Sequence, residues 1–370
     1  DYNSKFYSSI SGSFIFSELM KNVKWLQYGK LRASWAEVGS IAGVGPYEGV
    51  LTYGYNQNPF NNQTLASVNG SNVPNPLLAP FKVTEKEIGL EMRMFKNRLM
   101  IDVAAFDKVT KDQIVDVVLS SASGYTGFKQ NVASLKNSGI ETLIEYKAVQ
   151  GKNFKWTTSW NNAFLKTEVL DVGTPSGTRL LLYFNGTGNE FLGEIRYTEG
   201  LAMNQLYTRT YRRNAKGEIV VGNNGRLLES QGGPVGNGFF PVGSSIPKFT
   251  GGWNNTFSYK NFSLNVHFDY KFGGTVISST LLNMTRQGHS KLSLVGRQDG
   301  LIFPAVYEST GLPNTTKITV AGNGLQTFYT DYRNLQIGDP FVFKSDFVKL
   351  RNISLAYDFY DLLKKSSFLK

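Results

Sequence analysis

Histidine and cysteine, which supply many metal sites and catalytic centres, are scarce in this sequence. The 370 residues include two histidines, His267 and His289, and no cysteine. Disulfides, thiolate metal sites and cysteine nucleophiles are therefore excluded, and a histidine-rich zinc site or a catalytic triad has few residues to draw on. Acidic residues are too dispersed for a calcium loop of the EF-hand type. We predict neither a metal ion nor a cofactor for this chain.

Two pairs of carboxylates have a regular spacing that could suggest acid–base chemistry. Glu87 and Glu91, and likewise Glu141 and Glu145, are four residues apart. In an extended strand this spacing is about 13 Å, too far for the two carboxylates of a glycosidase, although a pair formed across two strands stays open. The simpler interpretation is that these groups bond to neighbouring polar residues. Since a phosphate-binding glycine pattern is also missing, we predict that the protein is not an enzyme.

Segments rich in tyrosine and asparagine are better candidates for function. Aromatic faces stack on sugars and peptide groups, and amide side chains both donate and accept hydrogen bonds. The same composition also suits solvated, turn-rich loops, so ligand binding and simple solvation are both open. The candidate ligand-contact residues are Tyr53, Tyr55, Asn56, Asn58, Tyr183, Tyr307, Tyr329 and Tyr332.

The elements that would position these residues are strands, because apolar and polar residues alternate along the chain. From Phe262 to Phe272 every second residue is aromatic or aliphatic, and Phe249–Tyr259 carries its aromatic residues in a similar alternation. Successive side chains of a strand point to opposite faces, and only Lys260 and Asn261 separate the two segments. The pattern predicts an antiparallel hairpin with a tight turn.

Two further hairpins are predicted upstream from the same alternation. The strands and turns are Ile88–Met94 returning through Lys96-Asn97 into a strand that begins at Arg98, and Ile140–Ala148 joined to Phe154–Phe164 across residues 150–152. These runs reach the length of about ten residues that a tilted strand needs to cross a bilayer, whereas no apolar run is long enough for a membrane-spanning helix.

Long connections follow the other ends of the predicted strands. They cover Gly39–Thr84, Val169–Ser245 and Gly274–Asp346. Connections of this length usually carry function. Short turns at one rim and long loops at the other are typical of an outer-membrane barrel, in which the apolar face contacts lipid and the polar face lines a wet lumen. A soluble β-sandwich alternates in the same way and stays open as an alternative.

The formal net charge of +11 does not indicate a nucleic-acid partner. Lysine and arginine are spread thinly along the chain, and the densest clusters, Arg212-Arg213 and Lys364-Lys365, hold two basic residues each. A nucleic-acid surface usually concentrates its positive charge on one face. We therefore expect no nucleic acid among the partners.

Six short segments form a further pattern that extends over essentially the whole chain. They are Tyr28–Gly39, Glu87–Glu91, Phe106 with Lys108, Thr110 and Asp112, Asn137–Glu141, the hairpin beginning Ile246-Pro247, and Phe347–Tyr357. In this order, the segments resemble the barrel strands of SusC/RagA-type TonB-dependent transporters.

The resemblance implies an all-β fold, in which residues 1–370 form part of one antiparallel transmembrane β-barrel domain with long extracellular loops. About nine or ten strands would belong to a barrel of about 22, the size of plugged outer-membrane transporters. The plug domain and the energy-coupling box would lie outside this chain.

The resemblance also implies a location in the outer membrane, in contact with its lipid. The whole protein would import a bulky nutrient, an oligosaccharide or a peptide, with energy from the TonB complex and with a SusD-like lipoprotein on the cell surface. The alternatives are a soluble or surface-anchored β-sheet adhesin or glycan-binding module, and a passive porin.

Overall fold

In the computed structural model of the chain, strands dominate and helices are few. The structure describes residues 6–45, 47–55, 58–68, 70, 72–119, 121–125, 127–183 and 192–364. These residues form two compact units. The first comprises Asp1–Thr174, Phe249–Tyr270 and Phe347–Lys370, and the second comprises Pro175–Lys248 and Lys271–Asp346.

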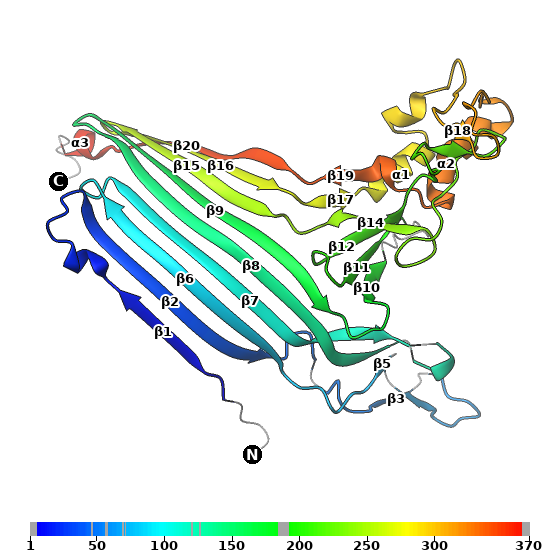
Figure 1. Cartoon of the computed structure of the whole chain (residues 1–370), viewed down its shortest axis with the longest axis horizontal. Helices are drawn as coiled ribbons and strands as arrows, with labels where there is room; N and C mark the ends of the chain where they lie inside the picture. The colour runs from blue at the N-terminus through cyan, green and yellow to red at the C-terminus, as the bar shows by residue number, and fades with distance from the viewer. Residues whose placement is uncertain are drawn as a thin grey trace. The chain divides into compact units, whose positions relative to one another are not determined.

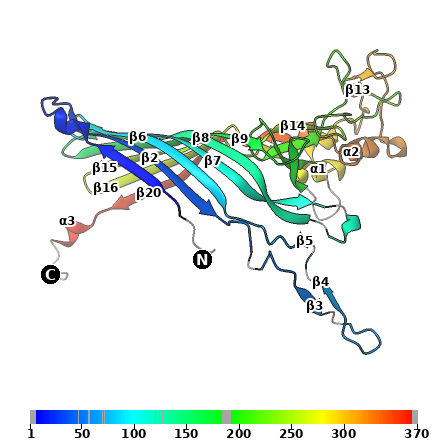
Figure 2. The same ribbon diagram turned by 60° about the horizontal axis from the view of Figure 1, so that its bottom comes forward.

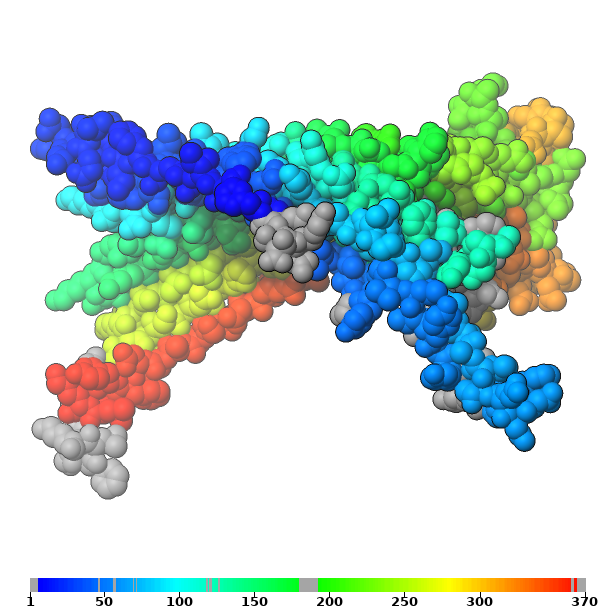
Figure 3. Space-filling view, turned by 90° about the horizontal axis from the view of Figure 1, so that it is seen from below, coloured from blue at the N-terminus to red at the C-terminus, as the bar shows by residue number. Residues whose placement is uncertain are grey.

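The first unit is built on one sheet whose strands lie side by side in chain order (Figures 1 and 2). The pairs from β1 to β15 are antiparallel, and β1 and β20 are the edge strands of the described sheet (Figure 3, from blue to red). Its strands are β1 (Ser9–Phe14), β2 (Leu26–Ser40), β6 (Phe81–Met94), β7 (Leu99–Val118), β8 (Gly127–Gln150), β9 (Phe154–Asp171), β15 (Phe249–Tyr259), β16 (Phe262–Phe272) and β20 (Phe347–Tyr357), with β5 (Asn72–Val73) paired to β8.

Smaller elements complete the first unit. The strands β3 (Tyr53–Tyr55) and β4 (Ala66–Val68) form a separate antiparallel hairpin within the connection between β2 and β6. Three short helical turns are η1 (Phe16–Leu19), η2 (Ser121–Ser123) and α3 (Tyr360–Leu363). None of the helices in the described residues of the chain is long and apolar enough to cross a membrane.

All three predicted hairpins are present in the sheet. β15 and β16 are joined by Lys260 and Asn261, as predicted. Between β6 and β7, three consecutive residues of the turn, at positions 95–97, have positive φ angles, which allows a tight reversal. The strand after this turn begins at Leu99 and not at Arg98, because the N–H of Arg98 closes the turn on the carbonyl of Met94, at 3.0 Å.

The strand registers give the sheet one apolar face and one polar face. Aligned residues in neighbouring strands form cross-strand rows, and adjacent rows point to opposite faces. One row on the apolar face contains Gly12, Ala33, Ile88, Ala105, Ile140, Phe164 and Phe249. The adjacent row on the polar face contains Ser13, Arg32, Gly89, Ala104, Glu141, Ala163 and Thr250.

Aromatic side chains on the apolar face cover the few polar groups there. Trp253 stacks between Trp160 and Phe268, with ring centroids 5.8 Å and 5.5 Å apart. The indole N–H of Trp253 donates to the hydroxyl of Thr158 at 2.8 Å, and Thr158 is buried. A polar group that faces hydrocarbon must be satisfied within the protein, and these contacts meet that requirement.

The second unit consists of two of the long connections, which fold into regular structure. Its four-stranded sheet contains β10 (Thr178–Tyr183), β11 (Glu194–Thr198), β12 (Gln205–Arg209) and β14 (Phe239–Ser244). Two further strand pairs are β13 (Val220–Val221) with β18 (Val306–Tyr307), and β17 (Thr275–Ile277) with β19 (Val342–Lys344). The helices are α1 (Ser279–Arg286), α2 (Gly324–Asn334), η3 (Lys291–Leu294), η4 (Ala321–Asn323) and η5 (Asp339–Phe341).

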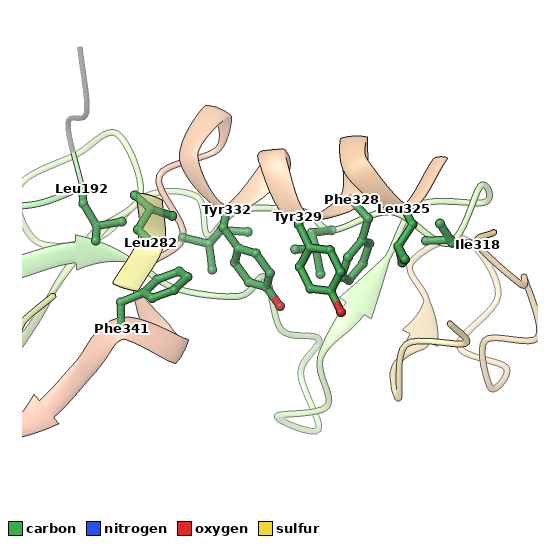
Figure 4. Close-up of a cluster of buried hydrophobic side chains, with 10 residues drawn as sticks. Leu192, Leu282, Ile318, Leu325, Phe328, Tyr329, Tyr332 and Phe341 are labelled. Carbon is green, nitrogen blue, oxygen red and sulfur yellow. The ribbon is translucent and has the colours of Figure 1, made fainter. Parts of the chain in front are cut away.

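The core of the second unit forms around one face of α2 (Figure 4). Leu325, Phe328, Tyr329 and Tyr332 follow the helical spacing of three and four residues and are each at most 5% exposed. The ring of Tyr332 meets the ring of Phe341 edge-on, with centroids 5.5 Å apart. The sequence did not predict these helices, but the all-β class is confirmed because strands still dominate the chain.

Candidate functional site

A cavity of about 580 Å³ lies on the polar face of the large sheet. Side chains from six strands line it. Charged and polar groups dominate the lining. They include Arg32 of β2, Asp102 of β7, Glu141 of β8, Asn161 of β9, Thr250 of β15, and His267 and Asp269 of β16.

Arg32 crosses a whole strand of the sheet to reach its partner. It starts on β2, passes over Gly89 of β6, and donates to Asp102 of β7 at 2.8 Å. Its Nε also lies 3.3 Å from Glu87 on β6. A side chain at position 89 would collide with the guanidinium. The glycine in the segment Glu87–Glu91 therefore makes room for an ion pair that spans three strands.

Gly251 and Gly252 on β15 also make room for side chains that cross from a neighbouring strand, one on each face of the sheet. The ring of Tyr270 covers Gly251 on the apolar face, and the ring of His267 covers Gly252 on the polar face. The hydroxyl of Tyr270 also donates to the side-chain carbonyl of Asn162. Both β16 rings can cross β15 only because neither position has a Cβ, and this places His267 in the cavity wall, as the alternation predicted.

The acidic groups of the polar face differ in their partners. Glu87 is held by Arg32, and Glu91 lies 3.5 Å from Lys30 and 3.0 Å from Arg93. These carboxylates are engaged in ion pairs, as the simpler interpretation of their spacing expected. Glu141, by contrast, makes no hydrogen bond or ion pair with any other described residue, and it is exposed to the cavity. The cavity wall thus offers one carboxylate to a further partner.

Of the predicted ligand-contact residues, Tyr53 and Tyr55 are the most exposed. They lie on β3, with 66% and 81% of their surfaces accessible. Asn58 follows β3 and is exposed as well, whereas Asn56 lies outside the described residues. Both rings are therefore available for stacking, and their contact with a ligand stays a prediction.

Tyr183 and Tyr307 lie in strands of the second unit. Tyr183 ends β10, and its side chain is not among those described. The hydroxyl oxygen of Tyr307 lies 3.2 Å and 2.7 Å from the hydroxyls of Thr315 and Thr316, and it accepts the backbone N–H of Thr315 at 3.0 Å. The two threonine side chains and this N–H lower the pKa of Tyr307 to about 8.

Tyr329 and Tyr332 are interior residues. The hydroxyl of Tyr329 donates to the carbonyls of Leu292 and Val295, both at 2.9 Å. The hydroxyl of Tyr332 lies 3.0 Å from that of Tyr211, and burial raises the pKa of Tyr332 to about 12. These contacts favour a structural role, because the rings would have to leave the core to meet a ligand. The helical spacing from Leu325 to Tyr332 was the signal that could have placed them inside.

The cavity on the polar face was not predicted as a site. Its residues belong to the alternating segments, and the parity of the alternation already put His267 and Asp269 on the polar side. The charged residues of the other strands join them only once the cross-strand register is known. Among the described residues, no three histidine, aspartate or glutamate side chains come close enough to hold a metal ion.

Long antiparallel strands with an outward apolar face and a polar face around a cavity define the wall of a membrane β-barrel. The sequence profile of the family described as TonB dependent receptor-like, beta-barrel matches residues 2–224. The chain belongs to this family. Its members are outer-membrane receptors for transport, so the chain is an outer-membrane protein and not an enzyme.

Curated relatives match nearly the whole chain. A TonB-dependent receptor of Formosa agariphila is 25% identical over 95% of this chain and 36% of its own length. The TonB-dependent receptor SusC of Bacteroides thetaiotaomicron is 23% identical over 94% of this chain and 33% of its own length. The chain thus spans about a third of the length of these relatives.

Solved structures show the same fold. The structure of the RagAB peptide transporter matches 95% of this chain and 37% of its own, with a TM-score of 0.69 and 21% sequence identity. A RagAB peptide importer in a state described as closed-closed matches with a TM-score of 0.70. The predicted partial barrel and the SusC/RagA resemblance are confirmed.

Proposed function

We propose that this chain is part of the barrel wall of a TonB-dependent transporter that imports a bulky nutrient across the outer membrane. In this proposal residues 1–370 belong to one barrel domain, and the remaining strands come from other parts of the protein. The observation that carries it is the two-faced sheet. The nine strands from β1 to β20 place apolar side chains on the outer face. Their charged and polar side chains lie on the inner face, where several form ion pairs.

The dimensions of the sheet support a membrane location for the strands. A tilted transmembrane strand needs about 9–11 residues. β2 and β6 have 15 and 14 residues, and β15 and β16 have 11 each. β8 has 24 residues, more than twice that need. The central strands therefore continue beyond the hydrocarbon layer, where the long connections begin.

The printed descriptions of the relatives support the partners and the cargo. One structural neighbour is a peptide transporter, and one sequence relative is SusC. We propose a SusD-like lipoprotein as the surface partner, the TonB complex as the energy source, and an oligosaccharide or a peptide as the substrate. TonB would act through parts of the protein outside this chain.

Uptake measurements in living cells test the transport proposal. Cells that carry the full-length protein should accumulate a labelled oligosaccharide or peptide, and accumulation should stop when TonB is removed. Uptake that persists without TonB would favour a passive porin. Release of the protein from membranes by salt without detergent would favour an adhesin. Deletion of a neighbouring lipoprotein should reduce uptake if the partner is correct.

The exposed hairpin of β3 and β4 supplies the ligand contacts in this proposal. Replacing both Tyr53 and Tyr55 with alanine removes two accessible rings and should weaken substrate binding by about tenfold, or about 1.4 kcal/mol. Because neither ring is packed, barrel assembly should be unchanged when followed by heat-modifiable migration on gels. Tyr332→Phe is the contrasting control, since its ring stays in the core. Unchanged affinity in a correctly assembled double variant would remove this hairpin from the binding site.

A further inference from the structure

A second cavity, of about 420 Å³, lies within the second unit between α1, η3 and α2. Its floor is apolar, formed by Leu325 and Tyr329 of the α2 core, and Val320 extends this apolar surface outward. Two arginines, Arg286 and Arg297, complete its wall. No aspartate or glutamate lines the cavity within the described residues.

Arg297 is fixed in place by neutral acceptors. Its Nε donates to the carbonyl of Ser293 at 2.9 Å, and one terminal nitrogen donates to the carbonyl of Gly288 at 2.6 Å. The same nitrogen lies 3.3 Å from the hydroxyl of Ser293. These bonds hold the planar guanidinium in one orientation and leave its Nη1 without an acceptor among the described residues. A charged group held in this way is prepared to receive a ligand without further ordering.

Two other arginines of this unit have carboxylate partners, unlike Arg297. Arg226 forms a two-pronged ion pair with Asp331, and Arg212 lies 2.8 Å from Glu308. Arg297 pairs with no carboxylate among the described residues. Arg286 adds a second positive charge on the same wall. The cavity therefore combines the charge of Arg297, which no described carboxylate neutralises, with an apolar floor.

We propose that this cavity binds a carboxylate attached to an apolar group, as at the C-terminus of a peptide that ends in an apolar residue. The guanidinium of Arg297 would donate to the carboxylate oxygens, since arginine matches carboxylate geometry. The apolar side chain would lie against Leu325 and Val320. The inference rests on the proposed import function, because it names the ligand class that this part of the protein selects. A uronic acid offers the carboxylate but no apolar group to fill the floor.

The test uses the full-length receptor purified in detergent and a pair of matched probes. One probe is the tripeptide Ala-Leu-Leu with a free carboxylate, and the other is the same tripeptide with a C-terminal amide. The wild-type protein should bind the acid at least about tenfold more tightly than the amide. Arg297→Gln should abolish this preference and leave the affinity for the amide unchanged. Arg286→Gln should reduce the preference in part.

Lys291→Gln is the matched control, because Lys291 begins η3, is exposed and does not line the cavity. It removes the same charge and should keep the full preference. An unchanged affinity for the amide in Arg297→Gln also shows that the unit is still folded, and Arg297→Lys should restore part of the preference if the first variant assembles poorly. Equal binding of acid and amide by the wild type would overturn the proposal. A preference that survives in the Arg286→Gln and Arg297→Gln double variant would overturn it too.

A second probe pair, digalacturonate and its neutral counterpart, separates the two sources of a carboxylate. An Arg297-dependent preference for digalacturonate, without one for the peptide acid, would overturn the peptide assignment.

Failure of the proposed import function can be distinguished from failure of the proposed binding site. Uptake that needs TonB but shows no carboxylate preference would remove only the site. A preference in the purified receptor without TonB-dependent uptake would remove only the import function.

Discussion

Large apolar side chains lie on the outside of one compact unit and on the inside of the other. In the sheet of the first unit, Ile88, Ile140 and Phe164 are 53%, 47% and 48% exposed. In the second unit, Phe328 and Phe341 are at most 1% exposed. The first unit has hydrocarbon as its solvent on one face, so its apolar side chains need not be withdrawn from it. The second unit follows the ordinary rule for water, in which burial of apolar surface drives folding.

The difference teaches that the two units depend on different interactions. In a bilayer the backbone groups of a strand must be paired, and the ladder from β1 to β20 supplies these bonds. Because the backbone bonds hold the sheet together, polar side chains on the inner face, such as the ion-paired Arg32 and Asp102, can form the lumen wall. In the second unit, close packing around α2 determines the structure. The same substitution should therefore have different consequences in the two units.

The largest expected effect comes from truncating one phenylalanine in each unit. Phe328→Ala removes a ring from the packed core and leaves a cavity, which costs about 3–5 kcal/mol. Phe164→Ala removes a ring from the lipid-facing surface, where no cavity forms, and should cost less than half as much. The free energy of opening of the second unit, from hydrogen exchange in the assembled receptor, should fall only for Phe328→Ala. Equal protection in both variants would contradict this contrast.

The next effect concerns the two faces of a single strand, β16. Leu264→Arg places a charge on the lipid-facing side and should cost about 2–4 kcal/mol near the bilayer midplane, and Val266→Arg should behave in the same way. Asn265→Arg is the matched control on the polar side, where it replaces an amide that bonds to Asn254 and Thr256, both at 3.0 Å. The heat-modifiable fraction of the full-length protein measures assembly. Equal tolerance at all three positions would show that the faces are wrong.

The sequence predicted the sheet better than it predicted the second unit, and the reason is again the solvent. Lipid on one face and water on the other impose a strict alternation, which is visible from Phe262 to Phe272. β8 begins at Gly127, well before the predicted start at Ile140, because its first part mixes polar residues on both faces. A strand needs no continuous apolar face where it extends beyond the hydrocarbon.

The candidate sites were also only partly predictable from local sequence patterns. Tyr329 and Tyr332 were predicted as loop residues because a segment rich in tyrosine and threonine resembles a solvated loop, although the helical spacing within α2 marks one buried face. The cavity on the polar face requires Thr250 to lie beside Ala163, across a connection that contains much of the second unit. Local sequence patterns carry no information on such a pairing, so the cavity could be recognised only in the folded sheet.

A smaller effect tests the glycine beneath Arg32. Gly89→Ala forces the guanidinium away from Asp102 and Glu87, two partly exposed pairs, and should cost about 1 kcal/mol. Gly12→Ala on β1 is the control, because its Cβ would meet no atom within 4 Å. The urea midpoint of the assembled barrel should fall only for Gly89→Ala. If both variants unfold at the same midpoint as the wild type, the ion pair across β6 does not contribute to the stability of the sheet.

The smallest effect is the ionisation of Tyr307 in the second unit, where threonine hydroxyls and a backbone N–H lower its pKa to about 8. A tyrosine with a depressed folded pKa contributes stability above its unfolded pKa of 10.0 and loses this contribution as the pH falls through about 8. The gain between pH 8 and 10 should be slight, because the group is exposed to solvent. The difference in tyrosinate absorbance between wild type and Tyr307→Phe should show one group titrating near pH 8, and Thr316→Val should move that titration upward by removing the contact at 2.7 Å. If Thr316→Val leaves the titration unchanged, the hydroxyl of Thr316 does not lower the pKa of Tyr307.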